Sequence, residues 1–117
     1  MIYTFYMLSI GNLKYVGSTK NWSNRLSDHK YNCLNPNAPK YLYNCYISFR
    51  EYLQTNNLTW EHIEKHIITE IDINTENKTK EEIRKEVFKL ENTFCRIMGD
   101  NMNASLPLGN NVNFVEE

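Results

Sequence analysis

The chain has 117 residues, 41% hydrophobic and 13% aromatic, with a formal net charge of −1. This length predicts one domain over residues 1–117, with a wrapping or loose tail from about residue 100. No apolar run approaches the roughly 18 residues of a membrane span, and the first residues do not read as a secretory leader, so we expect an intracellular protein with no membrane partner. The three scattered cysteines argue against a disulfide framework or a structural zinc site.

The net charge hides an asymmetry along the chain. Residues 1–50 hold six basic side chains and one acid, whereas residues 51–117 hold seven basic side chains and thirteen acids. We therefore expect the first half to carry a positive surface, which could meet phosphate groups. Ordinary solvated faces are the alternative interpretation of the same charges.

A β-hairpin is the first predicted element. Residues 2–10 form a β-branched and aromatic run, residues 11–12 are the turn dipeptide Gly-Asn, and residues 13–16 resume a strand. If the loop has two residues, paired residue numbers sum to 23. This rule sets the register for the whole hairpin.

The register decides which tyrosines meet. It places Tyr6 opposite Gly17, and strand alternation then puts Tyr6 and Tyr15 on the same face of the sheet. Gly17 leaves an open space beside Tyr6. A slipped turn would reverse the assignment and bring Tyr3 beside Tyr15 instead.

A helix is predicted next, over about Asn21–Cys33, with an apolar stripe that includes His29. Arg25 and His29 are four residues apart and lie on adjoining parts of one side. Both are expected to point back over the hairpin. For His29 considered by itself, a histidine at the edge of the core that bonds to the backbone is the alternative.

The middle of the chain predicts a second helix and a third strand. The helix covers residues 39–55, because its opening proline suits a first turn, and Leu42 belongs to its buried stripe. The strand covers residues 60–71, where the odd positions make one continuous face. His62 and His66 have the spacing of a zinc-binding pair on a helix, but no clear third and fourth ligand follows.

A long helix is predicted to begin at Thr79 and to end near Met98, with Gly99 as its stop. Glu91 borders the apolar stripe of this helix. A carboxylate held at the edge of a core is costly unless it has a cationic or metal partner. Glu91 is therefore a candidate ligand, and a surface pair with a lysine is the alternative.

The stretch YVGSTKN, followed after three residues by RL and then by a histidine, spans residues 15–29. Together with the late Glu91 and with Asn103 in the run MNAS, it resembles the GIY-YIG nuclease superfamily. Where the family name expects Gly-Ile-Tyr, residues 4–6 read Thr-Phe-Tyr. The resemblance implies an α+β fold: a small three-stranded antiparallel sheet flanked by helices, in the order β-β-α-α-β-α.

The resemblance also implies an activity, the hydrolysis of phosphodiester bonds in DNA with one divalent metal ion, Mg²⁺ or Mn²⁺. Tyr6 and Tyr15 would be the motif tyrosines and Arg25 the phosphate-binding arginine. His29 would be the helix histidine found in some branches of the family, and Glu91 would hold the metal.

DNA contacts are expected from basic side chains of the first half and from the late asparagine: Lys14, Lys20, Lys30, Lys40 and Asn103. A targeting module is not recognisable in the sequence, so a partner protein or a homodimer could direct the activity. Two rival interpretations are a catalytically silent DNA-binding module and a tyrosine-rich domain that binds a peptide.

The residue types suit the chemistry. Cleaving a phosphodiester requires a nucleophilic water, neutralisation of the charge on the phosphate and a stabilised leaving oxygen. Arginine clamps phosphate oxygens with its planar fork. Tyrosine has a reference pKa of about 10, so a tyrosine base needs neighbours such as Arg25 and Lys20. The second tyrosine or His29 would relay the proton.

Overall fold

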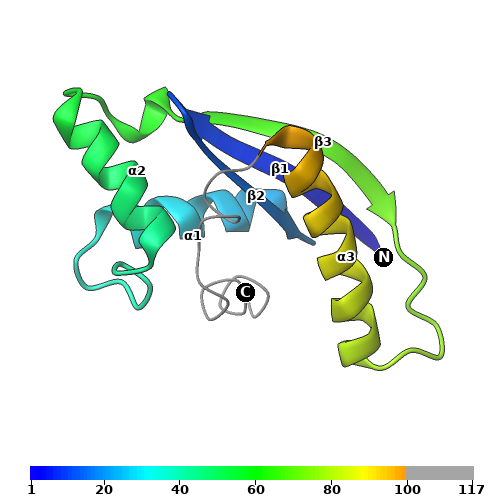
Figure 1. Cartoon of the computed structure of the whole chain (residues 1–117). Coiled ribbons are helices and arrows are strands. Elements are labelled where there is room, and N and C mark those ends of the chain that lie inside the picture. Colours follow the sequence, from blue (N-terminus) through cyan, green and yellow to red (C-terminus); the bar gives the residue numbers. More distant parts are fainter. Residues whose placement is uncertain (100–117) are drawn as a thin grey trace.

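The structure is a computed structural model that describes residues 1–99. Its elements are β1 (Ile2–Ile10), β2 (Leu13–Thr19), α1 (Trp22–Leu34), α2 (Asn44–Thr55), the 3-10 turn η1 (Trp60–His62), β3 (Glu64–Asp72) and α3 (Lys80–Met98). The strands form an antiparallel sheet in the order β2-β1-β3, which confirms the predicted fold class (Figure 1). The predicted tail lies outside the described residues. None of the helices within residues 1–99 has both the length and the apolarity needed to cross a bilayer.

The β1–β2 hairpin has the predicted register. Tyr6 pairs with Gly17 and Leu8 pairs with Tyr15, so Tyr6 and Tyr15 share a face. The open space expected at Gly17 is filled by the Tyr6 side chain, because a Cβ atom at Gly17 would lie 2.5 Å from the Tyr6 hydroxyl oxygen. Only glycine at position 17 allows Tyr6 this approach without a shift of one partner.

Consecutive residues of β1 pack in two different cores, because side chains alternate across a strand. Tyr6 and Leu8 pack with α1 and α2, in a core that also contains Tyr46. Phe5 packs on the opposite side of the sheet with Val87 of α3. The sheet therefore separates the α1–α2 pair from α3, and Figure 1 shows these helices apart from each other around the strands.

The second helix begins later than predicted. It starts at Asn44, so the predicted helix over residues 39–55, with a proline in its first turn, was wrong at its N-terminal end. Residues 35–43 form turns in which each backbone hydrogen bond spans three residues. The guanidinium of Arg50 connects this segment to α1, because it donates to the carbonyl of Cys33 in α1 at 2.8 Å and to the carbonyl of Tyr41 at 3.0 Å. Leu42 is consequently 75% exposed and does not join the buried stripe.

The third strand starts at Glu64 and contains an irregularity that interrupts its alternation. The register between β1 and β3 shifts between Phe5 and Tyr6. An extra residue on one strand moves the residues beyond it to the other face. The predicted continuous face of odd residues was therefore wrong, since Ile63 packs in the α1–α2 core and Ile71 in the α3 core.

Helix α3 has the predicted ends. The Thr79 hydroxyl accepts from the backbone N–H of Glu82, and the Glu82 carboxylate accepts from the backbone N–H of Thr79. Gly99 ends the helix with a φ of 68°. Between these ends, α3 lies against β2 and brings Glu91 to the edge of the sheet.

Candidate active site

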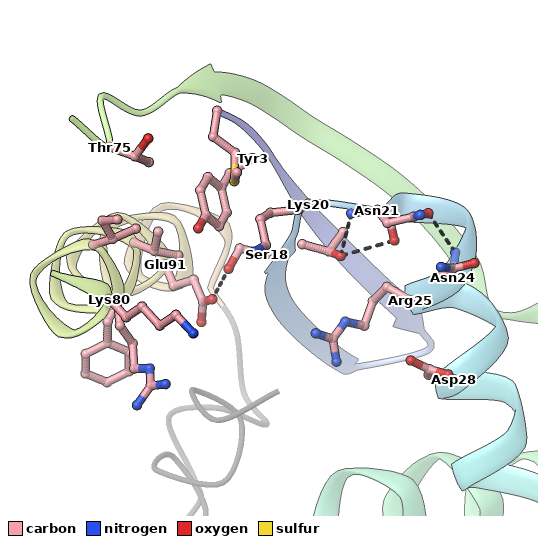
Figure 2. Close-up of a pocket in the computed structure, with 16 residues that line it drawn as sticks. Tyr3, Ser18, Lys20, Asn21, Asn24, Arg25, Asp28, Thr75, Lys80 and Glu91 are labelled. Carbon is pink, nitrogen blue, oxygen red and sulfur yellow. Dashed lines mark hydrogen bonds between the residues drawn. The ribbon is translucent and has the colours of Figure 1, made fainter. Parts of the chain in front are cut away.

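A cleft of about 630 Å³ opens between α1 and α3, beside the end of β2. Six charged side chains line it: Lys20, Arg25, Lys80 and Arg84, with the acids Asp28 and Glu91. In Figure 2, Arg25 and Asp28 project from α1 on one side, and Glu91 and Lys80 from α3 on the other. Because cations outnumber acids, the cleft suits an anionic ligand.

Glu91 is the buried acid of this cleft, with 8% of its surface exposed. The Ser18 hydroxyl, at the end of β2, donates a hydrogen bond to its carboxylate (Figure 2). Burial of a carboxylate is tolerated where hydrogen bonds or charges compensate its lost hydration. This contact fixes α3 against the edge strand and directs the acid at the same space as the cations.

The junction between β2 and α1 places Arg25. The Thr19 hydroxyl bonds to the backbone N–H and C=O of Asn21, at 3.0 and 3.1 Å. The Asn21 side chain then caps α1 by accepting from the N–H of Asn24 at 3.1 Å. Arg25 follows one turn into the helix and lines the cleft that also contains Glu91.

The other predicted site residues form a buried cluster in the α1–α2 core. The Tyr6 hydroxyl lies 2.6 Å from Nε2 of His29, and the ring of Tyr15 lies 5.4 Å from that of His29, centroid to centroid. Nδ1 of His29 lies 2.8 Å from the hydroxyl of Tyr46. We call Tyr6, Tyr15, His29 and Tyr46 the ring cluster. His29 is thus bonded to two tyrosine hydroxyls and is no ordinary core-edge histidine.

Burial governs the charge of His29. Loss of hydration lowers its pKa to about 3, and the positive charges of Arg25 and Lys40 act in the same direction. The imidazole is therefore neutral near pH 7, with a proton on one of its two nitrogens. One nitrogen donates a hydrogen bond and the other accepts one.

This burial predicts that the protein loses stability in acid. Between pH 6.5 and about 3 an unfolded chain protonates His29 and the folded chain does not, so the free energy of unfolding falls as pH falls. The stabilisation is fully present above pH 6.5, and the expected slope from this group is about 1.4 kcal/mol per pH unit. Urea denaturation across this range measures it. His29→Gln should lose that part of the slope, the exposed control His66→Gln should keep it, and equal slopes would contradict the prediction.

The cleft and the ring cluster adjoin each other at the edge strand. Gly17 faces Tyr6 on the α1–α2 side of β2, and the next residue, Ser18, reaches Glu91 on the α3 side. Helix α1 also connects the two groups, since it carries both Arg25 and His29. The cleft and the ring cluster are therefore one helical turn apart on α1 and one residue apart on β2.

Tyr3 and Tyr6, the alternatives that the hairpin register places beside Tyr15, lie in different parts of the structure. Among the described residues, the cleft lining includes Tyr3 and no member of the ring cluster. Tyr3 packs at the α3 core, whereas Tyr6 is 1% exposed beneath α1. Tyr3 therefore lies in the cleft with Glu91, whereas Tyr6 is bonded to His29 in the ring cluster.

The predicted DNA-binding residues are dispersed over the molecule. Of the four lysines, Lys20 lines the cleft. Lys14 donates to a carbonyl in the last turn of α3 at 3.1 Å, Lys30 lies 3.8 Å from a glutamate of η1, and Lys40 lies 6.0 Å from the centre of a tyrosine ring. Asn103 lies outside the described residues. DNA contacts by all four lysines and by Asn103 stay predictions.

Sequence reasoning missed two of the four cleft cations. Lys80 and Arg84 lie in the acidic half of the chain, so the charge asymmetry drew attention away from them. A signal was available, because Lys80, Arg84 and Glu91 follow one another at spacings of four and seven residues, which places them on one face of a helix. Ser18 was also missed, although it directly follows Gly17 in the motif.

Glu91 is the residue of the cleft best suited to a metal ion. Across residues 1–99 no three His, Cys, Asp or Glu side chains gather as a ready-made metal site. Magnesium is usually held by one or two carboxylates together with waters and substrate phosphates. A buried carboxylate in a cleft that also contains an arginine therefore fits magnesium, whereas zinc takes three or four protein ligands.

Comparisons of the chain with family models, curated proteins and solved structures gave no match. What the fold and the cleft define is a class: an α+β domain with a buried acid and four cations beside the edge of a three-stranded sheet. A functional assignment within this class depends on the chemistry of those side chains.

Proposed function

We propose that the protein is a DNA endonuclease of the GIY-YIG type, which hydrolyses phosphodiester bonds with one divalent metal ion, magnesium or manganese. The observation that carries this proposal is that buried Glu91 and Arg25 line the same cleft. The adjoining Tyr6–His29 hydrogen bond adds the tyrosine and histidine that the family resemblance calls for. These residues come from one strand and two helices.

The cations of the cleft would bind the DNA backbone. Arg25 would hold the scissile phosphate, because a guanidinium binds two phosphate oxygens at once. Lys20, Lys80 and Arg84 would contact neighbouring phosphates from both walls of the cleft. Contacts of this kind carry little sequence information and weaken with salt. We therefore expect salt-sensitive and largely sequence-independent binding.

Glu91 would hold the metal ion, with the phosphate and waters completing its ligands. When bound, the ion supplies charge stabilisation at the phosphate and the leaving oxygen. Ser18 keeps the Glu91 carboxylate oriented toward the cleft. Tyr6 would take the proton of the attacking water as general base. Because Tyr6 is 1% exposed and does not line the cleft, this role requires the ring cluster to open toward the cleft when DNA binds. Tyr15 would support the ring cluster by packing against His29.

Incubation of purified protein with supercoiled plasmid and magnesium tests the proposal. Nicked or linear product that disappears with EDTA is the expected result. Salt-dependent DNA binding without cleavage would instead identify a silent DNA-binding module. Failure to bind DNA even at low salt would favour a peptide-binding domain, and either result would overturn the nuclease proposal.

The α3 wall of the cleft gives a separate prediction. Lys80→Ala and Arg84→Ala should each weaken DNA binding and lower the slope of log affinity against log salt by about 1, because each removes one phosphate contact. Fluorescence anisotropy with a labelled oligonucleotide at several salt concentrations measures both quantities. Lys85→Ala is the matched control, since it removes the same charge from an exposed position of α3 outside the cleft lining. A slope that changes equally in all three variants would contradict this assignment.

A further inference from the structure

The hydroxyl of Tyr46 is hydrogen-bonded to Nδ1 of His29, and the proposed reaction gives Tyr46 no role. It lies in the first turn of α2, is 2% exposed, and its hydroxyl lies 2.8 Å from Nδ1 of His29. The ring of Tyr43 stacks on its ring at 6.4 Å between centroids. With Tyr6 at 2.6 Å from Nε2, the hydroxyl of Tyr46 completes a buried row of three polar groups.

A neutral imidazole allows only two arrangements of hydrogen atoms in this row. In the first, Tyr6 donates to Nε2 and the Nδ1–H donates to Tyr46. In the second, Tyr46 donates to Nδ1 and the Nε2–H donates to Tyr6. The tautomer of a histidine is set by the bond that its other nitrogen makes. The hydroxyl of Tyr46 is therefore placed to decide what His29 presents to Tyr6.

The second arrangement suits a tyrosine that must lose its proton. His29 resists protonation because it is buried beside positive charges, so it is poorly suited to take a proton from Tyr6. An Nε2–H can instead donate to the Tyr6 oxygen and stabilise the negative charge that forms there, since hydrogen bonds to ionised acceptors are strong. Tyr6 would give up its hydroxyl proton to bulk water when it ionises, before it accepts the proton of the attacking water.

We propose that Tyr46 is a positioning residue: its hydroxyl donates to Nδ1 of His29, keeps the ring proton on Nε2, and thereby makes His29 a donor to the oxygen of Tyr6. The two distances in the row permit either tautomer, and the proposed role of Tyr6 as the base selects this one. Its catalytic consequence rests on the proposed nuclease function, with Tyr6 as the base. Tyr46 touches neither DNA nor metal in this arrangement.

Long-range ¹H–¹⁵N correlation spectra of protein labelled with ¹⁵N-histidine read the tautomer without DNA. Nε2 of His29 should show the chemical shift of a protonated nitrogen and Nδ1 that of an unprotonated one. Tyr46→Phe should move both shifts toward each other as the two tautomers mix. The exposed His62 and His66 serve as internal references. A proton on Nδ1 in the wild type, or unchanged shifts in Tyr46→Phe, would overturn the inference.

Cleavage kinetics test the consequence. Tyr46→Phe should lower kcat about tenfold or more with KM unchanged, an effect typical of partners that orient a functional histidine. Tyr52→Phe is the control, because Tyr52 is also on α2 and packs against the same core but lies beside Gly11. Equal kcat in wild type and a folded Tyr46→Phe variant would refute the positioning role. Absence of cleavage by the wild type would refute the nuclease proposal itself, and the spectra would still decide the tautomer.

Discussion

Replacing Glu91 with glutamine should lower the rate of DNA cleavage about a thousandfold. The amide keeps the size of the side chain and an oxygen that can accept from Ser18, but it loses the negative charge that would hold a divalent cation. Removal of one preorganised electrostatic group from an active site commonly costs a factor of this size. Plasmid nicking under single-turnover conditions, at several magnesium concentrations, measures the effect.

The structure offers a close control for Glu91. Glu86 is also on α3 and forms an ion pair of 2.9 Å with Lys78 away from the cleft lining. Glu86→Gln makes the same chemical change and should leave cleavage within a factor of about two, since partly exposed ion pairs contribute little. Thermal unfolding of both variants checks folding. Wild-type cleavage rates in a folded Glu91→Gln protein would rule out the proposed role of Glu91.

Tyr6→Phe should lower kcat by about 10² to 10⁴, the usual contribution of a general base. The change also leaves Nε2 of His29 without its partner in a buried place. We therefore expect a loss of about 1 to 3 kcal/mol in the free energy of unfolding. Urea denaturation gives the stability change, and cleavage assays below the unfolding transition give kcat separately.

Tyr3→Phe separates the two candidate tyrosines of β1. Tyr3 lines the cleft on the Glu91 side, whereas Tyr6 is bonded to His29 in the ring cluster. If Tyr6 is the base, Tyr3→Phe should keep most of the activity and should not disturb the nitrogen shifts of His29. Loss of activity in Tyr3→Phe together with full activity in Tyr6→Phe would transfer the role of base to Tyr3.

Local interactions explain which predictions about the elements succeeded. A Gly-Asn turn sets the hairpin register through a two-residue loop, so the pairing of Tyr6 with Gly17 follows from neighbouring residues. The ends of α3 are likewise set by Thr79 and Gly99, whose caps involve residues within one turn. Turns and caps of this kind can be recognised from a few neighbouring residues of the sequence.

The wrong predictions concerned elements whose form depends on distant partners. The predicted helix over residues 39–55 included residues 39–43, but Arg50 of α2 binds the carbonyls of Cys33 and Tyr41, and the backbone between them forms turns. The face of β3 changes sides where its register against β1 shifts. Periodicity alone cannot reveal either effect, because the competing contact comes from another part of the chain.

The sequence by itself determined the hairpin register and the helix positions of Arg25, His29 and Glu91, because each depends on short-range turns, caps and periodicity. The fold class came from the family resemblance carried by the same residues. Only the tertiary structure decided how these residues are grouped. Docking of α3 against β2 places Glu91 in the cleft with Arg25 and adds the cations of α3. Packing of α1 on α2 sets His29 between two tyrosines, one of them on a helix that begins after the motif ends. Such contacts join residues far apart in the chain, and the burial they create determines the charge of His29.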